Sequence, residues 1–209
     1  MKKIFGLATL FFVLFFGLTA TVHARNVATE GEDFVLEAGE TNKDDLFAVG
    51  RNVTIDGNVD GDLYAAGGNV FINGDVTGDV LATGGDVTIK GVVGGDVRVA
   101  GGNVTIAGDV IHNVTVIGGN VVIDKDGVIE GNVTAFSGNL IIDGLVDGNL
   151  KVSAGRLTIN NKVEGNIEAL VDELGLGPAA TVSGNLRYIS QNPATIERGA
   201  TISGTVAHD

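Results

Sequence analysis

The residues of this sequence that could do chemistry are carboxylates repeated at a fixed spacing. Four aspartates, each followed by Leu or Val, recur at intervals of 17 residues: Asp45, Asp62, Asp79 and Asp96. In a structure that stacks with this period the carboxylates would form a row about 4.8 Å apart, a distance at which like charges repel one another. The repulsion is relieved if the row faces solvent, if the pKa values rise, or if a cation lies among the carboxylates. Solvent exposure is the default interpretation, and a calcium-binding row is the alternative.

Other catalytic chemistry has few candidate residues. After residue 24 the histidines are His112 and His208, and the chain has no cysteine and no G-x-S-x-G motif. His112 takes a position that glycine occupies in neighbouring repeats, which is typical of an exposed corner. Enzymes that cleave polysaccharides on β-helices need paired carboxylates or a basic cluster among long loops, and this chain has nearly no long loops. The sequence therefore indicates a protein that is not an enzyme and has no cofactor.

The carboxylates belong to a repeat of 17 to 20 residues, the first feature to look for because it decides the fold. Its clearest column is Asp or Asn before an aliphatic residue, and it registers ten units: Asp45, Asp62, Asp79, Asp96, Asn113, Asn132, Asn149, Asn166, Asn185 and, more loosely, Thr205. Within one unit the aliphatic residues Val53, Ile55, Val59, Leu63 and Ala65 are separated by two or four positions. Even separations are the period of a strand rather than of a helix.

The repeat predicts the fold. Glycines close three short strands per unit, and stacking each strand on its own copy makes every column a ladder of similar residues. The predicted fold is all-β, a right-handed single-stranded parallel β-helix of about ten coils with a triangular cross-section, its hand following the usual chirality of parallel crossovers. We predict a lead-in or cap over residues 25–44, in which Phe34–Leu36 forms a partial strand. The β-helix covers residues 45–209, with regular coils to about 166 and irregular closing coils over 167–209.

The first 24 residues have the pattern of a secretory signal peptide. Lys2 and Lys3 precede an apolar run, and Val22-His23-Ala24 fits the small-residue rule before a cleavage point. The apolar run is short for crossing a hydrocarbon core of about 30 Å, so cleavage after Ala24 is favoured over an uncleaved anchor. The chain is then exported, to the periplasm, the cell envelope or the medium, without a membrane span in the processed part. Its net charge of −13 disfavours nucleic acid and anionic lipid as partners.

Several units resemble the bactofilins, the polymer-forming bacterial cytoskeletal proteins. The stretches that carry the resemblance are G-N-V-D-G-D-L-Y-A (57–65), G-L-V-D-G-N-L-K-V (144–152) and V-E-G-N-I-E-A (163–169). The closing stretches L-G-P-A-A-T-V-S-G-N-L-R-Y (176–188) and P-A-T-I-E-R-G-A-T-I-S-G-T-V (193–206) resemble the exported branch of that family. The resemblance implies a right-handed, three-sided parallel β-helix that assembles end to end into filaments without nucleotide.

We therefore expect an exported structural protein that assembles with itself into filaments or a cell-envelope scaffold. A β-helix ends in an open strand edge that templates another copy unless it is capped. The candidate contacts lie near the two ends of the helix: Phe34, Leu36, Ile202 and Val206. The alternative function is a monomeric β-helical module that binds cell-wall glycan or calcium.

Overall fold

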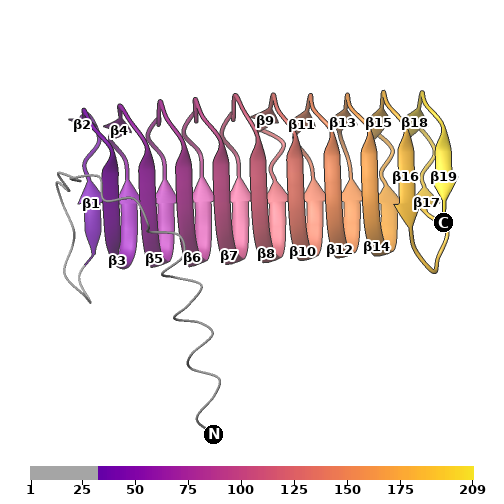
Figure 1. Cartoon of the computed structure of the whole chain (residues 1–209), viewed down its shortest axis with the longest axis horizontal. Coiled ribbons are helices and arrows are strands. Elements are labelled where there is room, and N and C mark those ends of the chain that lie inside the picture. Colours follow the sequence, from indigo (N-terminus) through magenta and orange to yellow (C-terminus); the bar gives the residue numbers. More distant parts are fainter. Residues whose placement is uncertain (1–32) are drawn as a thin grey trace, which may run out of the picture.

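The computed structural model describes residues 33–209, so the predicted signal peptide lies outside the described residues. Within this range the chain forms strands and no helix. The strands stack along one long axis as a parallel β-solenoid of about ten turns, from β1 (Phe34–Leu36) at one end to β19 (Val206–His208) at the other (Figure 1). The predicted all-β parallel β-helix is therefore confirmed.

Two kinds of strand build each coil. The long strands have ten residues each and pair side by side in parallel: β3 (Leu46–Ile55), β5 (Leu63–Ile72), β6 (Val80–Ile89), β7 (Val97–Ile106), β8 (Val114–Ile123), β10 (Val133–Ile142), β12 (Leu150–Ile159) and β14 (Ile167–Leu176). The short strands have two residues each: β2 (Thr41–Asn42), β4 (Asn58–Val59), β9 (Val128–Ile129), β11 (Leu145–Val146), β13 (Lys162–Val163), β15 (Thr181–Val182), β17 (Thr195–Ile196) and β18 (Thr201–Ile202). The last long strand is replaced by the four-residue β16 (Leu186–Ile189).

Each long strand supplies two of the three sides of a coil, because it turns a corner within one strand and only a single residue there, Gly68 in β5, is left out of the pairing register. In β5 the side chains of Leu63 and Ala65 are buried, and then those of Val70 and Ile72. The step from Ala65 to Val70 is odd, so the inward phase changes between them, at Gly67-Gly68. The sequence predicts that these glycines close a side, and the structure places the corner there.

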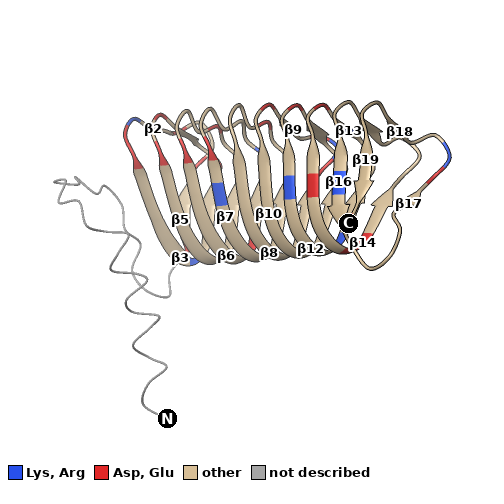
Figure 2. Cartoon of the chain, turned by 45° about the vertical axis from the view of Figure 1, so that its right-hand side comes forward, with Lys and Arg blue, Asp and Glu red and all other residues tan. Residues whose placement is uncertain are grey.

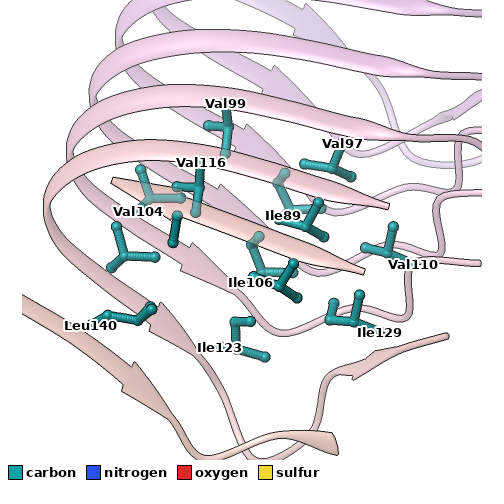
Figure 3. Close-up of a cluster of buried hydrophobic side chains, with 14 of the residues drawn as sticks. Ile89, Val97, Val99, Val104, Ile106, Val110, Val116, Ile123, Ile129 and Leu140 are labelled. Carbon is teal, nitrogen blue, oxygen red and sulfur yellow. The ribbon is translucent and has the colours of Figure 1, made fainter. Parts of the chain in front are cut away.

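The core is a filled column of aliphatic side chains that meet from all three sides (Figure 3). Val97 and Val99 come from the first side, Val104 and Ile106 from the second, and Val110 from the third, and all five are buried. Full burial of such a side chain contributes about 1.5–3 kcal/mol. No polar or charged residue within residues 33–209 is buried. Neighbouring coils therefore supply the core that lets the chain fold without disulfides.

The glycine columns are required by how closely the coils approach one another. A Cβ added at Gly74 would lie 2.0 Å from the carbonyl oxygen of Gly57, and one at Gly91 would lie 1.9 Å from that of Gly74. Among the described glycines, Gly39 and Gly199 are the ones with positive φ. Backbone contact between coils, rather than a left-handed turn, therefore explains why this position is glycine.

The two ends of the regular stack compare differently with the prediction. At the N-terminal end β1 is the strand predicted over Phe34–Leu36, and it pairs in parallel with β3, with Phe34 opposite Val53, so this segment adds a layer to the stack. At the other end β14 pairs along its whole length with β12, which extends the regular coils to Leu176, ten residues past the predicted limit. The alternation of β14 explains this, because its inward residues are apolar. Irregular chain begins after β16, where residues 190–194 leave the sheet.

Candidate functional site: the ladder, the ends and the outer face

The predicted carboxylate row is a hydrogen-bonded ladder. Oδ1 of Asp45 accepts a hydrogen bond from the backbone N–H of Asp62 at 2.9 Å. Asp62 and Asp79 repeat this bond with the backbone N–H groups of Asp79 and Asp96, both at 2.8 Å. One oxygen of each carboxylate is therefore held along the stack, and the row does not simply point into solvent.

The amide part of the column continues the same ladder. Oδ1 of Asp96 accepts hydrogen bonds from both the backbone N–H and the Nδ2 group of Asn113, at 3.0 and 3.1 Å. The same two bonds recur at each later step through Asn132, Asn149, Asn166 and Asn185. Thr205 ends the ladder, since its N–H and Oγ1 both donate to Oδ1 of Asn185 at 2.9 Å.

The cation beside the carboxylates is the guanidinium of Arg98. Its Nη1 lies 2.9 Å from Oδ2 of Asp79, and its Nη2 lies 2.6 Å from Oδ2 of Asp96. The pKa of Asp96 is lowered, first by the hydrogen bond from the Asn113 backbone and then by the Asn113 side chain and Arg98, against an opposing effect of desolvation. In residues 33–209 no group of three or more His, Cys, Asp or Glu side chains is placed to hold a metal ion. The oxygens proposed for calcium in this row thus bind the protein's own arginine at two of the four positions.

The C-terminal end exposes core positions. Val206 lies opposite Leu186, Ile202 opposite Val182, and Ile196 opposite Leu176, so all three continue buried columns. Yet 51% of Val206 and 48% of Ile196 are exposed, and Ile202 is half-buried. This coil therefore presents an apolar end face beside the unpaired edge of β19.

The N-terminal end differs from the C-terminal end in its burial. Phe34 and Leu36, the other two predicted contact residues, are buried. They stack on Val53 and Ile55 of the next coil, although β1 still ends the sheet and has one unpaired edge. The four predicted contact residues thus lie at the two ends of the solenoid, and within one chain the structure does not bring the two pairs together.

The two histidines within residues 33–209 lie at the surface in different coils. His112 is exposed at a corner, as predicted. His208 is exposed too, and its ring stacks on Tyr188 with centroids 4.4 Å apart while its Nε2 lies 2.9 Å from the carbonyl oxygen of Ser190. These contacts fasten β19 to the preceding coil, which is a structural role.

A surface that the sequence analysis missed covers the first side of the coils. We call it the outer face and define it by the outward residues of the first half of each long strand and of β16, in two columns: Phe47, Tyr64, Leu81, Arg98, Thr115, Thr134, Lys151, Glu168 and Arg187; and Val49, Ala66, Thr83, Ala100, Ile117, Phe136, Ser153, Leu170 and Ile189. Few charges interrupt the strands, whereas acidic residues line the loops (Figure 2).

A shallow groove of about 460 Å³ crosses the N-terminal half of the outer face, from β3 to β8. The rings of Phe47 and Tyr64 stack at its edge, with centroids 4.5 Å apart and planes 4° from parallel. Burial raises the pKa of the Tyr64 hydroxyl, and the carboxylates of Asp62 and Asp45 add to the effect. The outward residues differ in type from coil to coil, so they do not stand out in the sequence repeat. The apolar column becomes visible only when the outward residues of successive coils are aligned by their strand register.

Comparison of the chain with protein-family models, with curated proteins and with solved structures gave no match. The structure itself defines the class: a parallel β-solenoid whose sheet ends in unpaired strands. No helix long and apolar enough to cross a membrane occurs in the part of the chain from residue 33 onward.

Proposed function

We propose that this chain is a non-enzymatic structural protein that joins copies of itself end to end into filaments or a scaffold. The observation that carries the proposal is the last coil, in which the core positions Ile196, Ile202 and Val206 lie open or half-open beside an unpaired strand. An exposed edge of this kind templates pairing with another chain. A second copy stacked on it would bury the apolar end face and pair the free backbone groups of β19.

Two features of the sequence support the location and the mode of this assembly. The signal-peptide pattern of residues 1–24 supports export, so we place the filaments in the cell envelope or outside the cell. The resemblance of the repeat units to bactofilins supports polymerisation without nucleotide.

Sedimentation velocity and negative-stain microscopy of the purified chain over a range of concentrations test the proposal. We expect particles whose length grows with concentration and whose width stays constant. Val206→Asp places a carboxylate on the end face and is expected to stop this growth. Ala207→Asp is the matched control, because the neighbouring residue on β19 lies in the outward register, opposite Arg187, and should leave growth intact.

The alternative function gives a different result in the same experiment. A chain that stays monomeric at high concentration contradicts end-to-end assembly. If that monomer also co-sediments with purified cell wall, or melts at a higher temperature when calcium is added, it is a binding module for glycan or calcium.

A further inference from the structure

We propose that two copies of this chain also pair side by side through their outer faces, with the rods antiparallel and β8 of one copy opposite β8 of the other. The first observation is exposure. The second column of the outer face carries large apolar side chains in water, with Ile117, Leu170 and Phe136 exposed by 56%, 54% and 50%. Val49 and Ile189 extend the exposed column toward both ends of the rod. A contiguous apolar surface of this kind marks an interaction site.

The shape of the outer face identifies its partner as a second copy. Small residues, Ala66, Thr83 and Ala100, form part of the groove in the N-terminal half. The large residues Phe136 and Leu170 stand in the same column of the C-terminal half. A two-fold axis that runs along β8 places Ala100 opposite Phe136 and Ala66 opposite Leu170, so the large side chains of each copy enter the groove of the other.

The other two-fold arrangement, with parallel rods, lacks this fit. Each coil would then face its own copy, with the two columns of the outer face exchanged. Groove would lie against groove, and Leu170 would lie beside the carboxylate of Glu168. The antiparallel arrangement is therefore the one that fills the groove.

Charges and aromatic rings on the first column agree with the same register. The axis along β8 places Phe47 opposite Arg187, and Tyr64 opposite Glu168, a hydroxyl and a carboxylate. It also brings Lys151 of β12 over β6, next to the acidic half of the ladder. The ladder carries carboxylates in the N-terminal half of the rod and neutral amides in the C-terminal half, so antiparallel pairing sets the acidic half of one copy against the uncharged half of the other and keeps the two carboxylate rows apart.

The area is sufficient for a specific interface. The outer face crosses nine strands from β3 to β16, which at about 4.8 Å per strand and about 3.3 Å per residue gives a patch roughly 40 Å by 16 Å. Pairing would bury about 1,300 Å² over both copies, within the range of stable protein interfaces. This pairing is independent of the end contact, because the outer face runs along the rod and not across its end.

Thiol cross-linking tests the register, and the chain suits it because it contains no cysteine. Ile117 lies on the two-fold axis, so Ile117→Cys is expected to form a covalent dimer with a short bismaleimide. Ala66→Cys and Leu170→Cys are expected to cross-link when the two variants are mixed and not when each is alone. Thr105→Cys, on the second side of β7, is the control. Efficient cross-linking of Ala66→Cys with itself would overturn the antiparallel register, and Ile117→Cys yields no higher than those of Thr105→Cys would overturn the pairing.

Sedimentation velocity separates this proposal from end-to-end assembly. In the Val206→Asp chain, which lacks the end contact, we expect a dimer of twice the chain mass. Adding Ala100→Glu, which blocks the groove, is expected to halve that mass, while circular dichroism shows an unchanged β spectrum because the side chain points outward. A monomer already in Val206→Asp alone would overturn the side-by-side pair, whereas long particles in Ala100→Glu alone would still support the end contact.

Discussion

Oδ1 of Asp79 accepts a hydrogen bond from the backbone N–H of Asp96 at 2.8 Å, and Oδ2 of the same carboxylate binds Arg98 at 2.9 Å. The Asp79 side chain thus ties together two successive coils, and the guanidinium of Arg98 neutralises part of the acidic row. Each aspartate of the repeat accepts a hydrogen bond from the coil that follows it, so the row contributes to holding the coils together.

Replacing this carboxylate is expected to separate its two roles. Asp79→Ala leaves the Asp96 N–H without its acceptor and should lower the free energy of unfolding by about 1–3 kcal/mol. Asp79→Asn keeps an acceptor oxygen, as Asn113 does for Asn132, and should cost less. Urea denaturation of both variants checks this; equal losses would show that charge rather than the ladder bond is what matters.

The stability of the fold is expected to fall in acid partly through Asp96. Its pKa is lower in the folded chain than in the unfolded chain, so its stabilisation is complete above its ordinary pKa near 4 and is lost as pH falls through the folded value. Glu164 and Glu173, whose pKa values are also lowered by Lys162 and Arg156, act in the same direction. We expect the melting temperature to fall less between about pH 5 and about pH 2.5 in Asp96→Asn than in the wild type. Plots of melting temperature against pH that run parallel for Asp96→Asn and the wild type would contradict this expectation.

A methyl group at Gly91 is expected to separate two coils. The new Cβ would lie 1.9 Å from the carbonyl oxygen of Gly74 and 2.5 Å from its carbon, and backbone on both sides cannot move away easily. We expect Gly91→Ala to destabilise the chain by about 3 kcal/mol or more. Gly175→Ala is the control, because the nearest atom to its Cβ is Oγ1 of Thr158 at 4.0 Å, and it should change stability by less than about 0.5 kcal/mol. Denaturation midpoints of the two variants give the comparison.

The stability cost of truncating an isoleucine is expected to be large in the middle of the rod and to depend on end-to-end assembly at its C-terminal end. Ile106 is fully buried, so Ile106→Ala is expected to cost about 2–5 kcal/mol at any concentration. Ile202 is half-buried in the single chain, and Ile202→Ala should cost less than half as much when the protein is dilute. At concentrations where filaments form, its cost should rise. Thermal melts over a dilution series measure both, and a constant cost for Ile202→Ala would count against the end contact.

Much of this fold could be predicted from the sequence because inward positions repeat. The Val-x-Ile pairs and the Asx column set the coil length, the parallel stacking and the strand register, and all three are found in the structure. Spacing could not predict which way each carboxylate points, so the hydrogen bond that Oδ1 of each aspartate accepts from the backbone N–H of the next coil came from the structure alone.

Outward positions were less predictable because their residue types do not repeat from coil to coil. Phe47, Tyr64 and Leu81 share one register position but differ in type, because water does not constrain them as the core does. The apolar outer face therefore required the three-dimensional register. The regular coils extend to Leu176, beyond the predicted limit near residue 166, because β14 stacks on β12 even though its residues depart from the repeat.

The acceptors and donors of the ladder also follow the order in which the chain is synthesised. At every step the accepting oxygen belongs to the earlier coil and the donating N–H to the later one, from Asp45 to Thr205. A coil that has just been synthesised therefore already displays the acceptor that the next stretch of chain needs, and its contacts lie mainly with immediate neighbours. The rod can thus be laid down in the order in which the chain emerges, each finished turn serving as the seed for the one that follows.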